Sequence, residues 1–69
     1  MIEYTVILEP GENNWSAYVP DLPGCVAAAP TRRETERLIR EAIGLHLQAM
    51  RDDGDPIPPP TSDAIRVAV

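Results

Sequence analysis

Cysteine, histidine and lysine are the scarcest of the chemically useful residues: this chain has one cysteine, one histidine and no lysine. A single cysteine cannot form a disulfide within the chain. Cys25 and His46 together supply too few ligands for a metal site built by one chain. We therefore expect Cys25 to be a buried structural thiol, and we expect no metal and no cofactor.

Positive charge is also scarce. Six arginines stand against eleven carboxylates, which gives a formal net charge of -5. Proteins that bind nucleic acid directly do so with basic patches that neutralise phosphates, and this chain as a whole would be repelled by them. The charge balance predicts no direct binding of nucleic acid, and it favours a basic partner.

Long apolar runs are absent as well. None approaches the roughly 20 residues that a membrane span requires, and the N-terminus lacks the basic region and apolar core of a signal peptide. We infer a cytoplasmic protein that makes no membrane contact. Its 69 residues allow one domain with a small core, so association with further copies is an expected route to stability.

The most informative stretch that is present is the corner Val19–Cys25. Pro20 and Pro23 fix φ and remove two backbone donors, while Gly24 can adopt a positive φ. A strand should therefore end at Val19 and another begin near Cys25. Two interpretations remain open: a structural turn, or a rigid loop that presents Asp21 and Leu22 to a partner.

Alternating apolar residues predict three strands around this corner. The first covers Ile2–Glu9, with every second side chain on one face. The turn formers of residues 10–14 join it to Trp15–Val19 in a hairpin. Cys25–Ala29 is the third strand, although alanine favours strands only weakly.

A helix follows the third strand. Thr31 and Glu34 form a capping box, and Gly54 followed by Pro56 should end the helix. Apolar residues at three- and four-residue spacing form the stripe that should pack on the sheet: Thr35, Leu38, Ile39, Ala42, Ile43, His46, Ala49 and Met50.

After a stiff, proline-rich connector at residues 55–60, Ala64–Val69 alternates again and predicts a fourth strand. The order β-β-β-α-β, with the usual right-handed crossover, predicts an α+β fold with sheet order 3-2-1-4 and one helix packed on one face. The other face would expose Tyr18 and Ile7, which favours pairing with another protein or another copy.

This order of elements resembles part of a ribonuclease H fold, whose metal-dependent chemistry requires clustered carboxylates. The first strand carries none at its centre, and the fourth has Asp63 only at its start. His46 has no nucleophile or carboxylate close to it in sequence, and no glycine-rich phosphate loop is present. We expect no enzymatic activity.

Several of these features together resemble the HicB family of antitoxins, over almost the whole chain. The matching motifs are Trp15 in the second strand, the run Val19-Pro20-Asp21-Leu22-Pro23-Gly24-Cys25, the Thr31-x-x-Glu34 cap, Glu41-Ala42-Ile43, and Asp53-Gly54-Asp55-Pro56-Ile57-Pro58-Pro59-Pro60. The resemblance implies a single HicB-like domain over residues 1–69 with a partly degraded ribonuclease H-like fold. It also implies tight binding to a small basic toxin, HicA, that cleaves RNA. Many relatives carry a C-terminal DNA-binding domain; we expect none here, and therefore no binding of operator DNA.

The resulting hypothesis is an antitoxin of a type II toxin-antitoxin system that neutralises a HicA-like mRNA-cleaving toxin by occlusion. The chain would form a homodimer or a higher homo-oligomer, and the predicted partner contacts are Asp21, Leu22, Trp15 and Tyr18, with a core role for Trp15 as the competing interpretation. One alternative is an orphan HicB-like scaffold or small-molecule-binding domain without a toxin partner. Another is a residual metal-dependent nuclease, for which the carboxylates are missing.

Overall fold

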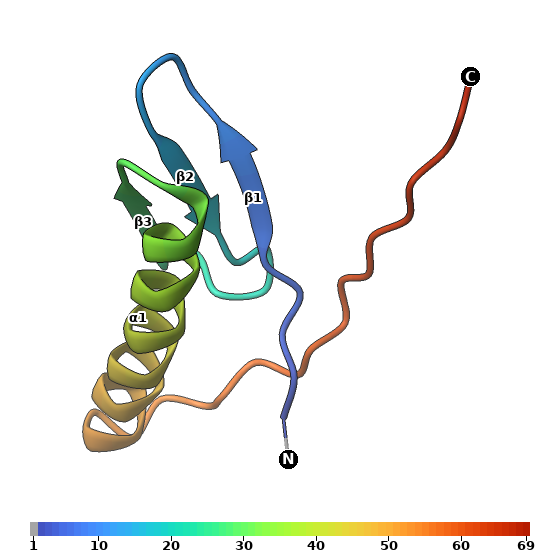
Figure 1. Ribbon diagram of the computed structural model, residues 1–69. Helices are drawn as coiled ribbons and strands as arrows, with labels where there is room; N and C mark the ends of the chain where they lie inside the picture. Colours follow the sequence, from blue (N-terminus) through green and yellow to red (C-terminus); the bar gives the residue numbers. More distant parts are fainter. Residues whose placement is uncertain (1) are drawn as a thin grey trace.

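The structure is a computed structural model that describes residues 2–69. Three strands precede one helix: β1 (Ile7–Pro10), β2 (Trp15–Tyr18), β3 (Val26–Ala29) and α1 (Arg32–Asp52). The strands form an antiparallel sheet in the order β1-β2-β3, and α1 packs on one face of it (Figure 1). The α+β class, the hairpin and the third strand are confirmed.

The strand register follows the predicted alternation. Ile7 lies opposite Tyr18, and Tyr18 lies opposite Val26, so these three side chains form a row across the face that points away from the helix. Leu8, Ala17 and Ala27 form the next row, which contacts the core on the helix side. A period of two along each strand therefore separates a core face from an outer face.

Both ends of α1 lie at the predicted capping residues. The Thr31 hydroxyl accepts a hydrogen bond from the Glu34 backbone N–H at 3.1 Å. At the C-terminal end, Gly54 adopts a φ of 73°. Its N–H donates to the carbonyl of Arg51, and the N–H of Asp55 donates to that of Met50, which together make a Schellman motif.

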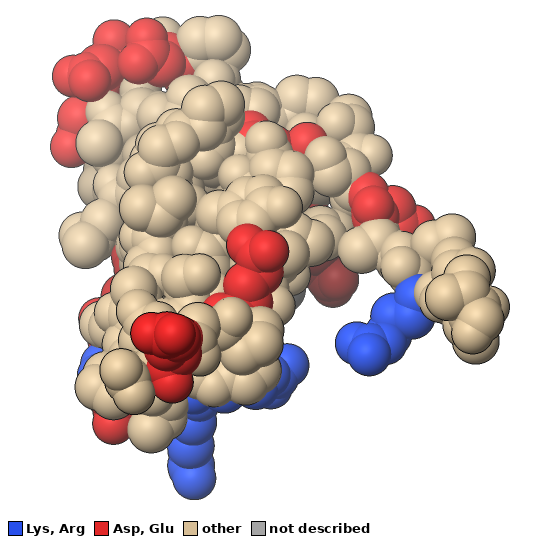
Figure 2. Space-filling view, turned by 90° about the horizontal axis from the view of Figure 1, so that it is seen from above, with Lys and Arg blue, Asp and Glu red and all other residues tan. Residues whose placement is uncertain are grey.

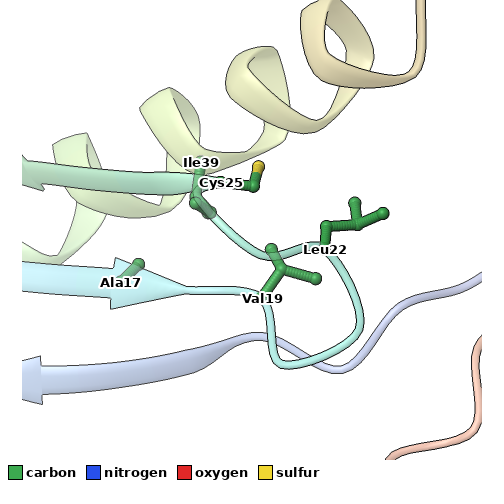
Figure 3. Close-up of a cluster of buried hydrophobic side chains, with 5 residues drawn as sticks. All are labelled: Ala17, Val19, Leu22, Cys25 and Ile39. Carbon is green, nitrogen blue, oxygen red and sulfur yellow. The ribbon is translucent and has the colours of Figure 1, made fainter. Parts of the chain in front are cut away.

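The core lies where the proline corner meets the helix. Ala17, Val19, Leu22, Cys25 and Ile39 form one buried cluster (Figure 3). Leu22 is fully buried, because the corner folds its tip inward: the Leu22 N–H donates to the Val19 carbonyl, and the Cys25 N–H donates to the Leu22 carbonyl. Gly24 completes the turn with a φ of 85°.

The fourth strand predicted at Ala64–Val69 does not form among residues 2–69, so the predicted order 3-2-1-4 has only its 3-2-1 part there. The connector before it is attached to the start of the chain: the Tyr4 hydroxyl donates to the Pro58 carbonyl, and the Thr5 hydroxyl donates to the Ser62 carbonyl at 2.8 Å. Beyond Ser62 the chain runs away from the sheet (Figure 1).

The first strand is also shorter than predicted, because it begins at Ile7 instead of Ile2. In the register of the hairpin, Thr5 would lie opposite Pro20, where β2 has already ended and no backbone donor is available. The side chains of residues 2–6 nevertheless point as predicted, since Tyr4 and Val6 pack against the core.

Candidate protein-binding surface

The outer face of the sheet carries an apolar row that the helix does not cover. We call Ile7, Tyr18 and Val26 the outer row; they are neighbours across all three strands. Tyr18 is 41% exposed and Val26 is 65% exposed, although both are large apolar residues. An exposed apolar row centred on an aromatic ring is a common feature of protein-binding surfaces.

Charge divides this molecule into two unlike halves. Residues 2–31, which build the sheet and the corner, contain no basic residue and carry the carboxylates Glu3, Glu9, Glu12 and Asp21. Five of the six arginines lie in α1. In Figure 2 the basic side chains lie along the lower side of the view and on the tail, whereas the upper side shows only acidic and uncharged side chains. The outer row is therefore set in an acidic half.

Asp21 joins the proline corner to the C-terminal part of the chain. Its two carboxylate oxygens accept four hydrogen bonds, from the backbone N–H and the hydroxyl of both Thr61 and Ser62, at 2.8 to 3.1 Å. These bonds lower the pKa of Asp21, and the Ser62 N–H has the largest effect because it is aimed at the charged form. We call this arrangement the Asp21 clasp.

The structure does not bring the four predicted contact residues together. Tyr18 lies on the outer face, whereas Trp15, three residues away on the same strand, is partly buried at the other end of β2. The Arg32 guanidinium lies 5.8 Å from the centre of the Trp15 ring. Leu22 is fully buried, so its side chain cannot touch a partner in this conformation, and the carboxylate of Asp21 is engaged in the clasp.

Sequence reasoning missed Val26, Thr61 and Ser62. Val26 could have been found by extending the hairpin register from Tyr18 to the third strand. Thr61 and Ser62 could not, because no local pattern indicates that they would bond to an aspartate some 40 residues earlier.

A groove of about 590 Å³ lies between the N-terminal segment and the helix. Its apolar lining comes from Ile2, Tyr4, Val6, Leu8, Ile39 and Ile43. The helix side of the groove carries Arg32, Glu36 and Arg40, and both arginines form ion pairs with Glu36. The hydrogen bond from Arg40 contributes most to lowering the pKa of Glu36.

Groups with catalytic potential are few in the described residues. Residues 2–69 contain no group of three histidine, cysteine, aspartate or glutamate side chains placed to hold a metal ion. Cys25 is buried, and burial raises the pKa of its thiol, which keeps it in the less reactive protonated form. α1, the one helix of residues 2–69, is not apolar enough to cross a bilayer.

Comparison with known proteins identifies relatives that match most of this chain. A family model for the HicB-like antitoxin of bacterial toxin-antitoxin systems matches residues 4–68. A UPF0150 protein of Thermoplasma acidophilum is 31% identical over 67 residues, which cover 96% of this chain and 97% of that protein. A 14.9 kDa protein of Haemophilus phage HP1 is 33% identical over 80% of this chain, which spans only 41% of the length of the phage protein.

A solved structure has the same architecture. A chain from the HicA3 and HicB3 toxin-antitoxin complex superimposes with a TM-score of 0.73 and 28% sequence identity. The match covers 87% of the present chain and 70% of the other. The likeness therefore extends over most of this chain.

Proposed function

Because this chain belongs to the family of HicB-like antitoxins of bacterial toxin-antitoxin systems, we propose that it neutralises a small, basic, HicA-like toxin that cleaves mRNA, without being an enzyme itself. The observation that carries the proposal is the outer row, an exposed apolar strip in a half of the molecule that has carboxylates and no basic residue. Its mode of action is occlusion of the toxin in the cytoplasm.

The physical basis is competition with RNA for one surface. A protein that binds RNA must offer a positively charged face, since phosphate contacts supply much of its affinity. The acidic sheet matches such a face in charge, and the outer row supplies the apolar centre that a stable interface needs. A toxin covered in this way cannot bring its catalytic groups to the RNA backbone.

Within this interface the residues have different roles. Tyr18 is the central anchor, since a buried aromatic side chain contributes large contact area at low entropic cost. Ile7 and Val26 flank it on the neighbouring strands. Asp21 adds to the negative charge of this half while its carboxylate holds the clasp. Trp15 lies on the helix side of the sheet beside Arg32, and Leu22 supports the corner from inside the core.

The experiment is co-expression of this chain with whichever short basic protein its own genome encodes beside it, followed by size-exclusion chromatography and an RNA-cleavage assay. We expect one co-eluting complex in which cleavage is suppressed. A complex without suppression, or separate elution with unchanged cleavage, would contradict the proposal and favour a scaffold or ligand-binding role.

A matched pair of variants tests the surface. Tyr18→Arg places a positive charge in the outer row and removes the anchor, whereas Leu45→Arg makes a similar change at a 73% exposed residue of α1. We expect Tyr18→Arg to weaken toxin binding by at least about a hundredfold and Leu45→Arg by less than about threefold. Equal effects of the two variants would exclude the outer row as the contact surface.

A further inference from the structure

The described chain has unused strand-pairing capacity at the edges of its sheet, β1 and β3, and in its tail. β1 is an edge strand of the sheet, and residues 2–6, which extend it toward the N-terminus, have no strand partner in the described chain. At the other end of the chain, Ala64–Val69 alternates apolar and other residues but pairs with nothing in residues 2–69. An unpaired edge is a template for strand addition.

The side chains of the β1 edge and the tail are also complementary. Ile65 and Val67 are 84% and 69% exposed, although both are β-branched residues that favour strands. The groove beside β1 is apolar along one wall and lies on the face of residues 2–8 that a paired strand would share. A strand added at the β1 edge would place every second side chain in this groove.

Charged side chains on the outer face of the sheet are complementary in the same arrangement. Arg66 alternates with Ile65 and Val67, so it would point to the outer face when they point into the groove. β1 and the residues before it carry Glu3 and Glu9 on that outer face, and Arg66 is the one basic residue outside α1. A cross-strand pair between Arg66 and one of these glutamates would hold Arg66 on the outer face of the added strand, and so keep Ile65 and Val67 on the groove side.

The chain's own tail is directed away from its own edge. The Asp21 clasp and the Thr5 bond hold Thr61 and Ser62 at the start of β1. From there the tail runs outward and does not return to the sheet (Figure 1). The β1 edge and the tail of one molecule therefore remain unpaired with each other. In a dimer with a twofold axis, the tail of each copy would pair with the β1 edge of the other.

We propose that this chain forms a homodimer by reciprocal strand exchange, in which Ala64–Val69 of each copy pairs along the β1 edge of the other and places Ile65 and Val67 in its groove. The exchange completes the ribonuclease H-like sheet order 3-2-1-4, with the fourth strand supplied by the second copy. It also adds apolar burial to a chain whose own core is small. The outer row stays free, so the dimer is compatible with toxin binding but does not depend on it.

The first test is the mass in solution of the full chain without any partner, measured by light scattering after size exclusion. We expect twice the 7.6 kDa of one chain at micromolar concentration. Val67→Asp places a charge in the groove twice per dimer and should raise the dissociation constant at least about a hundredfold. Ala68→Asp, its neighbour on the opposite face of the tail, is the matched control and should leave the dimer largely intact.

Both positions are exposed in the single chain, so circular dichroism should show an unchanged monomer fold in either variant. A wild-type chain that is monomeric at micromolar concentration would overturn the proposal. So would a dimer that Val67→Asp and Ala68→Asp weaken equally.

The second test distinguishes exchange from a tail that folds back on its own groove. Isotope-labelled and unlabelled chains are mixed, and isotope-filtered NMR detects contacts between copies only. We expect contacts from the Val67 methyl groups to Val6 and Ile43 across the two copies. Contacts found only within one chain, or a dimer without these contacts, would overturn the exchange.

Discussion

Asp21 shows how much one side chain can determine in a chain of this size. The proline corner was expected either to be a plain turn or to present Asp21 to a partner. The structure uses its carboxylate to hold Thr61 and Ser62, and through them the path of the tail. This one residue therefore links the corner, the N-terminal segment and the segment that we propose to exchange.

The Asp21 clasp makes the tail sensitive to acid. Hydrogen bonds from Ser62 and Thr61 lower the pKa of Asp21, so the clasp contributes fully at pH values above the ordinary aspartate pKa of about 4. Its contribution is lost as the pH falls through the lowered pKa, because a protonated carboxyl accepts these N–H and O–H bonds poorly. We expect the amide protons of Thr61 and Ser62 to lose protection from hydrogen exchange only in that acidic range.

Two variants control this pH experiment, which follows the two amides by NMR. Asp21→Asn should release them at neutral pH, since the amide group can replace only part of the four bonds. Asp55→Asn makes the same chemical change at an exposed aspartate and should leave them protected. Protection that persists in Asp21→Asn would show that the Thr5 bond, and not the clasp, holds this segment.

Leu22 marks the limit of sequence reasoning at the scale of residues. Prolines on both sides indicate a rigid loop, and an apolar residue at its tip suggests an exposed contact. The tip instead folds inward, because the N–H of Leu22 and its carbonyl are both used inside the corner and its side chain joins the buried cluster. The direction of this side chain depends on a cluster that includes Ile39, which is distant in sequence.

At the scale of elements, local signals were enough for most of the fold. The cap at Thr31, the terminating Gly54 and the hairpin turn depend on residues within a few positions of one another, and all three are found as predicted. The fourth strand depends on a pairing between the two ends of the chain. Alternation shows that residues 64–69 can form a strand, but it cannot say which edge, or which molecule, provides the partner.

The two glycines of the helix region should respond in opposite ways to the same substitution. Gly44 lies inside α1 with open space around its Cα, so Gly44→Ala should raise the free energy of unfolding by about 0.5 to 1 kcal/mol. Gly54 has a φ of 73°, where a side chain is strained, so Gly54→Ala should lower it by about 1 kcal/mol. Urea titration measures both, and the same sign for both would contradict the cap geometry.

At the scale of the whole molecule, the proposed function depends on the separation of the arginine-bearing helix from the apolar, acidic outer face of the sheet. The helix covers one face of the sheet and holds most of the positive charge, so the other face keeps an apolar row among carboxylates. The exchanged strand would add to the sheet at its edge and leave that face open. The two proposed associations thus use different parts of the sheet, and each can be removed without the other.

The charge division predicts where electrostatic steering acts. Glu9→Lys on β1 and Glu41→Lys on α1 change the net charge equally, but only Glu9 belongs to the acidic half. For binding to a basic, HicA-like toxin at low salt, we expect Glu9→Lys to slow association about three- to tenfold and Glu41→Lys less than about twofold. Because salt screens the field, the difference should vanish near ~0.5 M salt, as surface plasmon resonance can measure. If both variants slow association equally, the net charge of the molecule steers the toxin, and its acidic half has no special role.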